Sequence, residues 1–191
     1  ICEASGADVG KVAEGIGMDA RIGRQFLNAG LGYGGSCFPK DVKAFIAISE
    51  ALGVPFGLLR EVERINAAQL DRFLGKIRDK LWVLREKRIA LWGLAFKHNT
   101  DDVRESVAVK LARRLLAEGA SVVAWDPVAT ETARRSGQLE GAIDYAADMY
   151  AALDGADALV IATEWPQFAA AELPQVKARL RTPLVFDGRN L

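Results

Sequence analysis

The sequence is poor in several features that mark whole classes of protein. Its 191 residues include two cysteines and one histidine, and 25 Lys plus Arg balance 25 Asp plus Glu. A zero net charge gives no sign of a nucleic-acid or anionic-membrane partner, and no apolar run approaches the roughly 20 residues of a membrane span. Two cysteines without metal-ligand spacing indicate reduced thiols, no metal site and a cytoplasmic setting. Half of the residues are hydrophobic, and the chain is long enough to bury one large core or two small ones.

The first half of the sequence has a helical pattern. Apolar residues recur at helical spacing from residue 7 to about 81, interrupted by a glycine-rich loop at residues 28–36 and by Gly53 with Pro55. The last of these stretches predicts a long helix with charges on one side, suited to a spine between domains or to a dimer seam. The opening residues, ICEA, read as the end of a helix already under way, so we expect a piece of a longer protein.

After residue 87 the pattern changes to that of an α/β domain. Four apolar runs predict strands at residues 88–96, 120–127, 156–163 and 183–189, with a helix at 106–118 and further short helices between them. Strands alternating with helices over short connections predict a Rossmann-like parallel sheet in a three-layer α/β/α arrangement. We place the boundary at the basic REKR, which divides a helical segment, residues 1–84, from the sheet domain, residues 85–191.

The loop GLGYGG, residues 30–35, has the G-x-G-x-x-G spacing of dinucleotide-binding loops. No buried-strand run precedes it, which disfavours that interpretation and leaves either a flexible surface loop or a loop that presents a thiol. Pro39 favours a helix start, so Cys37 is expected at a helix N-terminus, where free amides and the nearby Lys40 stabilise a thiolate. Asp41, one turn later, either faces the same pocket or only complements the helix dipole.

A second polar cluster follows the first predicted strand of the α/β half. The loop GLAFKHNTDDVRES, residues 93–106, occupies the place where open α/β sheets bind ligands. Lys97 and Arg104 offer two cations to a pyrophosphate or a sugar. His98 has no assigned role, although a hydrolase that pairs it with Cys37 is one alternative.

Two motifs together resemble the nucleotide-sugar 6-dehydrogenases. They are GYGGSCFPKD, residues 32–41, and GLAFKxNTDDxRES, residues 93–106, supported by GADVGKVAEGIGMDARIG, WDP, ATEWPQF and FDGRN. The resemblance implies a central helical dimerisation domain followed by a nucleotide-sugar-binding domain. It also implies NAD as cofactor, a homodimer through the central helices, and UDP-glucose as substrate, with GDP-mannose second. The NAD-binding domain would lie outside this sequence, so we expect no turnover from the chain alone.

The resemblance also implies roles for single residues. Cys37 matches the nucleophile and Asp41 the residue that handles water and protons. Cofactor contacts are implied for Lys40 and Arg104. Substrate contacts are implied for a loop, a strand end and two arginines: Arg21 (reaching the neighbouring subunit), Asn28, Leu31, Gly32, Tyr33, Gly34, Phe96, Lys97 and Arg189.

The chemistry implied by the resemblance needs an activated thiol. Two hydride transfers to NAD would oxidise the C6 alcohol of the sugar to an acid, while Cys37 holds the aldehyde as a thiohemiacetal and then as a thioester. A non-catalytic fragment that binds nucleotide sugar and dimerises is the alternative from a different class.

Overall fold

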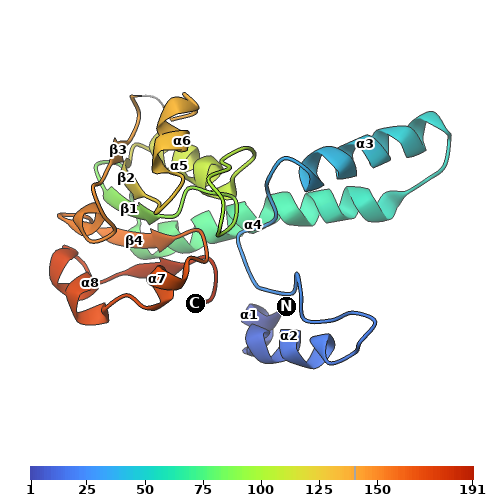
Figure 1. Cartoon of the computed structure of the whole chain (residues 1–191), viewed down its shortest axis with the longest axis horizontal. Coiled ribbons are helices and arrows are strands. Elements are labelled where there is room, and N and C mark those ends of the chain that lie inside the picture. Colours follow the sequence, from blue (N-terminus) through green and yellow to red (C-terminus); the bar gives the residue numbers. More distant parts are fainter. Residues whose placement is uncertain (140) are drawn as a thin grey trace.

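The computed structural model describes residues 1–139 and 141–191. Four helices precede residue 82: α1 (Cys2–Ser5), α2 (Val9–Gly17), α3 (Phe38–Ala51) and α4 (Gly57–Leu81). Figure 1 shows α3 and α4 as a hairpin that projects away from the sheet, while α1 and α2 lie apart from it. The predicted helical region is therefore two helical units joined by a long loop.

The remainder of the chain forms a parallel sheet. Its strands are β1 (Arg88–Trp92), β2 (Ser121–Trp125), β3 (Asp144–Tyr145), β4 (Ala158–Ile161) and β5 (Val185–Asp187), in the order β3-β2-β1-β4-β5. Between them lie α5 (Val107–Ala117), α6 (Thr130–Arg135), the 3₁₀ helix η1 (Ala151–Leu153), α7 (Pro166–Ala169) and α8 (Leu173–Arg179). The predicted α/β class is confirmed. Each predicted strand has a counterpart that is shorter than expected, and β3 is a fifth strand that the sequence pattern did not predict.

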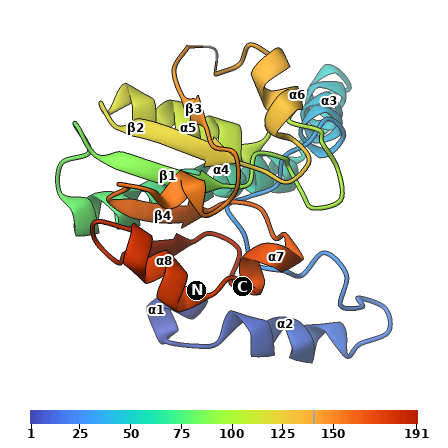
Figure 2. The same cartoon turned by 60° about the vertical axis from the view of Figure 1, so that its left-hand side comes forward.

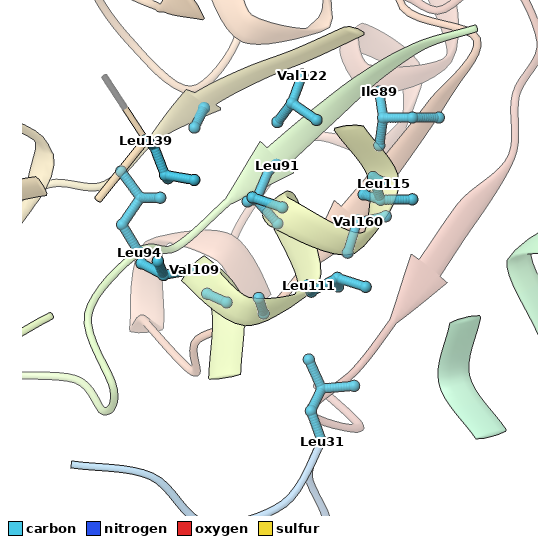
Figure 3. Packing of buried hydrophobic residues seen from close by; sticks show 14 of the residues in the cluster. Leu31, Ile89, Leu91, Leu94, Val109, Leu111, Leu115, Val122, Leu139 and Val160 are labelled. Atoms are coloured by element: carbon cyan, nitrogen blue, oxygen red, sulfur yellow. The ribbon is translucent and has the colours of Figure 1, made fainter. Parts of the chain in front are cut away.

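Both faces of the sheet are covered. Ile89 and Leu91 of β1 belong to a core with α4, α5 and α6, whereas Ala90 and Trp92 belong to a second core with η1, α7 and α8. Figure 3 shows the first core closing around α5. Successive residues of a strand point to opposite faces, so the part of a strand that is buried on both sides must be apolar, as Ile89 to Trp92 of β1 are.

Helix α4 connects the two parts of the molecule. Its later residues Phe73, Leu74 and Ile77 are buried in the first core, whereas Leu58 and Ile65, nearer its start, are 66% and 51% exposed. Figures 1 and 2 show the helix running from beneath the sheet out along α3. One helix therefore serves as a core element at one end and as half of the hairpin at the other.

The α3–α4 hairpin is held by few contacts of its own. The rings of Phe45 and Phe56 meet edge-on at 5.5 Å, and Arg60 Nη2 lies 2.6 Å from Glu50 Oε1. Phe45 remains 55% exposed, and Ile48 on the same helix 57%. The apolar face predicted for this helix is therefore present but largely uncovered within the single chain.

In residues 1–139 and 141–191, no helix combines the length and the apolar character that crossing a membrane requires.

Candidate functional site

The glycine-rich loop lies between α4 and the segment that follows β1. At Gly32, φ is +112° and a Cβ would stand 2.7 Å from Asn66 Oδ1 of α4. At Gly35, φ is +85° and a Cβ would stand 2.8 Å from the Phe96 ring. Only glycine combines these backbone angles with such close neighbours. The loop is packed between two elements, so it is not the flexible surface loop that the sequence left open.

Tyr33 ties the loop to α4. Its backbone N–H donates to Asn66 Oδ1 at 2.7 Å, and its carbonyl accepts from Asn66 Nδ2 at 3.2 Å. Its phenol donates to Glu63 Oε1 at 2.6 Å. Burial, and then the hydrogen bond to Glu63, raise the pKa of Tyr33 to about 12. The N–H, the carbonyl and the phenol of Tyr33 are therefore all bonded to α4.

Leu31 fixes the other end of the loop. It is 3% exposed and belongs to the core that α5 covers, and Figure 3 shows it reaching toward that core from the loop. Gly188, after β5, packs against its side chain. The predicted substrate contact at Leu31 can therefore involve only the backbone of that residue, because its side chain is buried by packing.

Cys37 follows the loop and occupies the N-cap position of α3, with Pro39 in the first turn. The predicted helix start is confirmed. The Cys37 side chain is exposed, and its Sγ lies 3.9 Å from Ser36 Oγ. The thiol is thus accessible beside the free amides of a 14-residue helix.

A shallow apolar cavity opens beside the thiol. Its volume is about 480 Å³, and it is lined by Cys37, Phe38, Asp41, Val42, Phe45, Phe56 and Leu59. Asp41 thus shares a cavity with Cys37, which was one of the two possibilities left open. The Asp41 carboxylate also lies 3.4 Å from Lys40 Nζ, and both side chains are largely exposed. Lys97 and Arg189 do not line this cavity.

Arg104 lies near the thiol from the other side of the loop. Its Nε and Nη2 donate to Asp102 at 3.0 and 2.8 Å. These hydrogen bonds are the main reason that the pKa of Arg104 is raised, and the nearby Cys37 side chain makes a smaller electrostatic contribution. The guanidinium is therefore within electrostatic range of the sulfur.

Lys97 and Phe96 stand at the carboxyl end of β1. Lys97 Nζ lies 5.3 Å from the centre of the Phe96 ring, in a cation–π arrangement. Among the described residues no carboxylate forms an ion pair with Lys97, whereas Arg104 and Lys40 are both paired. Of the cations predicted for the site, Lys97 is therefore the one that has no carboxylate partner in the described part of the chain, and it is available to bind an anionic ligand.

Arg189 is held in a half-buried polar cluster that the sequence did not predict. Its Nη2 lies 2.5 Å from Glu164 Oε2, and its guanidinium packs against Gly30. Glu164 Oε1 lies 3.0 Å from His98 Nδ1. In residues 1–139 and 141–191 no hydrogen bond joins His98 to Cys37, which removes support from the thiol hydrolase alternative. The sequence signal that could have identified Glu164 is its position just after the apolar run that forms β4.

Asp126, just after β2, is a further residue to which the sequence assigned no role. It is 2% exposed and accepts five hydrogen bonds. The donors are the backbone N–H groups of Leu94, Ala95, Val128 and Ala129 and the indole of Trp165. A buried carboxylate with this many donors fixes the loops that follow β1, β2 and β4 relative to one another.

Two predicted residues lie at the edges of this arrangement. The Arg21 side chain is 90% exposed and pairs only with Asp19, so it contacts no other site residue in the described part of the chain. Asn28 is exposed and lines a small cavity of about 140 Å³ together with Glu164 and Arg189.

A larger cavity, about 700 Å³, lies between α1, the start of the glycine loop, α4 and the residues after β5. Gly30, Leu31 and Gly188 line it, together with Arg72 and Lys76. The predicted residues are therefore spread over several surfaces and do not share one enclosed pocket.

Sequence models of one family match both parts of the chain. Residues 1–68 match the central domain of the UDP-glucose/GDP-mannose dehydrogenase family, and residues 90–191 match its UDP binding domain. The predicted boundary at 84/85 falls between the two ranges and stays a prediction.

The curated relatives include several proteins named UDP-glucose 6-dehydrogenase. UDP-glucose 6-dehydrogenase TuaD of Bacillus subtilis is 44% identical over 191 residues, which are 100% of this chain and 41% of TuaD. UDP-glucose 6-dehydrogenase of Pseudomonas aeruginosa is also 44% identical, with 43% of its length covered. The chain thus spans about two-fifths of the length of the curated relatives that it matches.

Solved structures of nucleotide-sugar dehydrogenases also resemble this chain. A UDP-glucose dehydrogenase from Pyrobaculum islandicum superposes with a TM-score of 0.88 and 42% identity, covering 97% of this chain and 41% of that one. A GDP-mannose dehydrogenase from Pseudomonas aeruginosa gives 0.68 and 26%, covering 98% of this chain and 44% of that one. A family model that matches more than half of the chain, together with these likenesses, confirms the predicted resemblance: the chain belongs to the UDP-glucose/GDP-mannose dehydrogenase family.

Proposed function

We propose that this chain is the thiol-bearing and nucleotide-sugar-binding part of an NAD-dependent UDP-glucose 6-dehydrogenase. One observation carries the proposal. The exposed Cys37 thiol stands at the first turn of α3, at the end of a glycine loop that is packed against the segment following β1. A reactive thiol and the ligand-binding edge of an α/β sheet are thereby brought next to each other.

Positive partial and full charges lie near Cys37. Free N–H groups at the start of α3 and the positive end of the helix dipole lie beside the sulfur, and the Arg104 guanidinium is close enough to interact with it electrostatically. A thiolate adds to an aldehyde, whereas a neutral thiol is a poor nucleophile. The local charges therefore suit covalent capture of an aldehyde.

The reaction oxidises the C6 alcohol of the sugar twice. The first oxidation gives an aldehyde, and the Cys37 thiolate adds to its carbonyl carbon to form a thiohemiacetal. Loss of a second hydride from that carbon gives a thioester. Water then displaces the thiolate and releases the carboxylate, with Asp41 placed in the same cavity to accept a proton. Each sugar thus gives up two hydrides, and Cys37 is regenerated.

Two molecules of NAD, bound one after the other, would each accept one hydride. Lys40 and Arg104 are exposed and flank the thiol, so both can reach a cofactor phosphate. Both are also paired with carboxylates, and the loop that follows β1 has no G-x-G-x-x-G turn. Lys40 and Arg104 therefore suit a contact with one side of the cofactor and do not form a complete cofactor site by themselves. In this proposal a further domain of the enzyme supplies the remaining cofactor contacts.

The nucleotide sugar is assigned to the carboxyl edge of the sheet. Lys97 has no carboxylate partner among the described residues and is available for a diphosphate oxygen. Exposed backbone near Asn28 and the small cavity beside Arg189 offer hydrogen bonds to the sugar. UDP-glucose is preferred to GDP-mannose because the relatives of higher identity carry the UDP-glucose name.

The same proposal includes a homodimer through the helical part. Phe45, Ile48 and Leu58 leave a large apolar surface exposed on α3 and α4, which a second copy would cover. Arg21 projects from the molecule, as a residue that reaches a neighbouring subunit would. Sedimentation velocity over a range of concentrations checks the expected dimer.

The test combines this chain with the NAD-binding part of a UDP-glucose dehydrogenase. With UDP-glucose and NAD, two NADH are expected for each sugar consumed, and the chain alone is expected to give none. Cys37→Ser should reduce formation of the carboxylate by about 10³-fold, roughly 4 kcal/mol of barrier. Cys2→Ser is the matched control, because that thiol lies in α1 and lines a different cavity.

Two results would contradict the proposal. Turnover by the unaided chain would show that the cofactor is bound here. Full activity of the Cys37→Ser variant would remove the covalent step. Calorimetric titration of UDP-glucose into the chain separates a binding-only fragment from an inactive one, and GDP-mannose in the same titration tests the second substrate.

A further inference from the structure

We infer that Asn66 of α4 is a positioning residue for the segment that carries the Cys37 thiol. The functional meaning of this inference rests on the proposed role of Cys37, but the geometry does not. The amide of Asn66 accepts from Tyr33 N–H at 2.7 Å and donates to Tyr33 O at 3.2 Å. One side chain thus pairs with both backbone groups of one residue, as a neighbouring strand would.

The loop is shaped to receive this amide. Gly32, the residue before Tyr33, has φ of +112°, and a Cβ there would stand 2.7 Å from Asn66 Oδ1 and 3.2 Å from the Asn66 carbonyl oxygen. Any larger residue at position 32 would push the loop away from α4. The close approach and the paired hydrogen bonds therefore depend on each other.

A second tie runs from the same face of α4. Glu63 precedes Asn66 by three residues, so the two side chains are neighbours on the helix. Its Oε1 accepts from the Tyr33 phenol at 2.6 Å. Tyr33 is therefore bonded to α4 through its backbone and through its side chain, across about 30 residues of sequence.

These ties fix the loop relative to the sheet. Asn66 lies two helical turns before Phe73, from which point α4 is buried in the core beneath β1. On the opposite side of the loop, Gly35 packs against Phe96 at the end of β1. The thiol of Cys37, four residues after Tyr33, therefore takes its position from α4 on one side and from the β1 segment on the other.

A purely structural role for Asn66 would lower the stability of the chain without moving the thiol. The two roles are separated by measuring where residue 37 lies, not how much protein is folded. Spin labels are placed on Cys37 and on a Lys177→Cys substitution in a Cys2→Ser background. Lys177 is exposed on α8, at the far layer of the sheet domain. Pulsed electron spin resonance then gives the distribution of distances between the two labels.

The expected result is specific to Asn66. Asn66→Ala should widen the distribution about twofold, because both bonds to the Tyr33 backbone are lost. Asn66→Asp should widen it less, since the acceptor for Tyr33 N–H is kept. Gln69→Ala is the matched control. Gln69 lies one turn further on α4, with no hydrogen bond to the loop among the described residues, and its substitution should leave the distribution unchanged.

A distribution as narrow as that of the parent in Asn66→Ala overturns the inference, and so does equal widening in Gln69→Ala. If Asn66→Ala does not fold, Asn66→Asp is judged by the same two criteria. No substrate or NAD enters the measurement. An unchanged distribution beside two NADH per sugar therefore refutes the role of Asn66 alone, whereas absent turnover beside a widened distribution refutes only the proposed enzyme.

Discussion

The two parts of the molecule bury their apolar side chains to very different degrees. In β1, the four residues from Ile89 to Trp92 are all fully buried. In α3 and the start of α4, by contrast, Phe45, Ile48 and Leu58 are more than half exposed. Both regions are rich in apolar residues, so composition does not distinguish them. The sheet domain covers its own apolar surface, whereas the hairpin leaves a surface that only another chain or domain can cover.

The residues of the candidate site differ in burial between the two parts in the same way. The residues of the sheet domain that support it have several polar partners each and are little exposed: Asp126 is buried, and Glu164 is half-buried. The residues of the helical part that would carry out chemistry, Cys37 and Asp41, are exposed. A rigid part thus supports the ligand-binding edge, and an open part presents the thiol where further protein has room to approach.

The largest expected effect tests the contrast within one helix. Leu74→Ala should lower the free energy of unfolding by about 3 kcal/mol, because it leaves a cavity in the core beneath the sheet. Leu58→Ala, on the same helix but 66% exposed, should cost less than about 0.5 kcal/mol. Urea unfolding followed by circular dichroism measures both. Equal losses would mean that the exposed half of α4 is already covered in solution.

A somewhat smaller effect is expected at Asp126. Asp126→Asn keeps the shape of the side chain but turns its amide N–H₂ toward groups that are themselves hydrogen-bond donors. We expect the free energy of unfolding to fall by about 2 kcal/mol. Asp148→Asn is the control, because this exposed carboxylate also accepts two backbone N–H groups and should cost less than about 1 kcal/mol. The same urea series measures both variants. A larger loss at Asp148 would contradict the view that burial makes the Asp126 network important.

Local sequence patterns predicted the elements that are determined locally. Four apolar runs became β1, β2, β4 and β5, and Pro39 located the start of α3. The strand β3 was missed because it is two residues long and pairs only with β2, so it leaves no apolar run. Such a strand is fixed by its neighbour and not by its own residues.

The candidate site was predictable only in part, for a similar reason. The thiol, the lysine after β1 and the glycines lie in short motifs that the resemblance covered. The partners of those motifs lie elsewhere in the chain: Asn66 and Glu63 for Tyr33, and Glu164 for Arg189. A hydrogen bond across 30 residues depends on tertiary packing, and a single sequence carries no pattern for it.

The smallest expected effect concerns the bonds between the glycine loop and α4 at Tyr33. Its pKa is raised to about 12, first by burial and then by Glu63, against about 10 for an unfolded tyrosine. The folded state therefore favours the neutral phenol. This contribution is fully present below pH 10 and is lost as the pH rises from about 10 to about 12, because the unfolded chain releases the proton first.

Since Tyr33 is half-buried and water screens it, the contribution should be on the order of 1 kcal/mol. Stability measured in urea from pH 9 to pH 12 should fall more steeply in the parent than in Tyr33→Phe, and the difference between the two curves isolates this one group. Glu63→Gln should give an intermediate slope, because burial remains while the negative acceptor is removed. Parallel curves for the parent and Tyr33→Phe would mean that the phenol is not held against α4 in solution, and that the loop is tied to the helix by Asn66 alone.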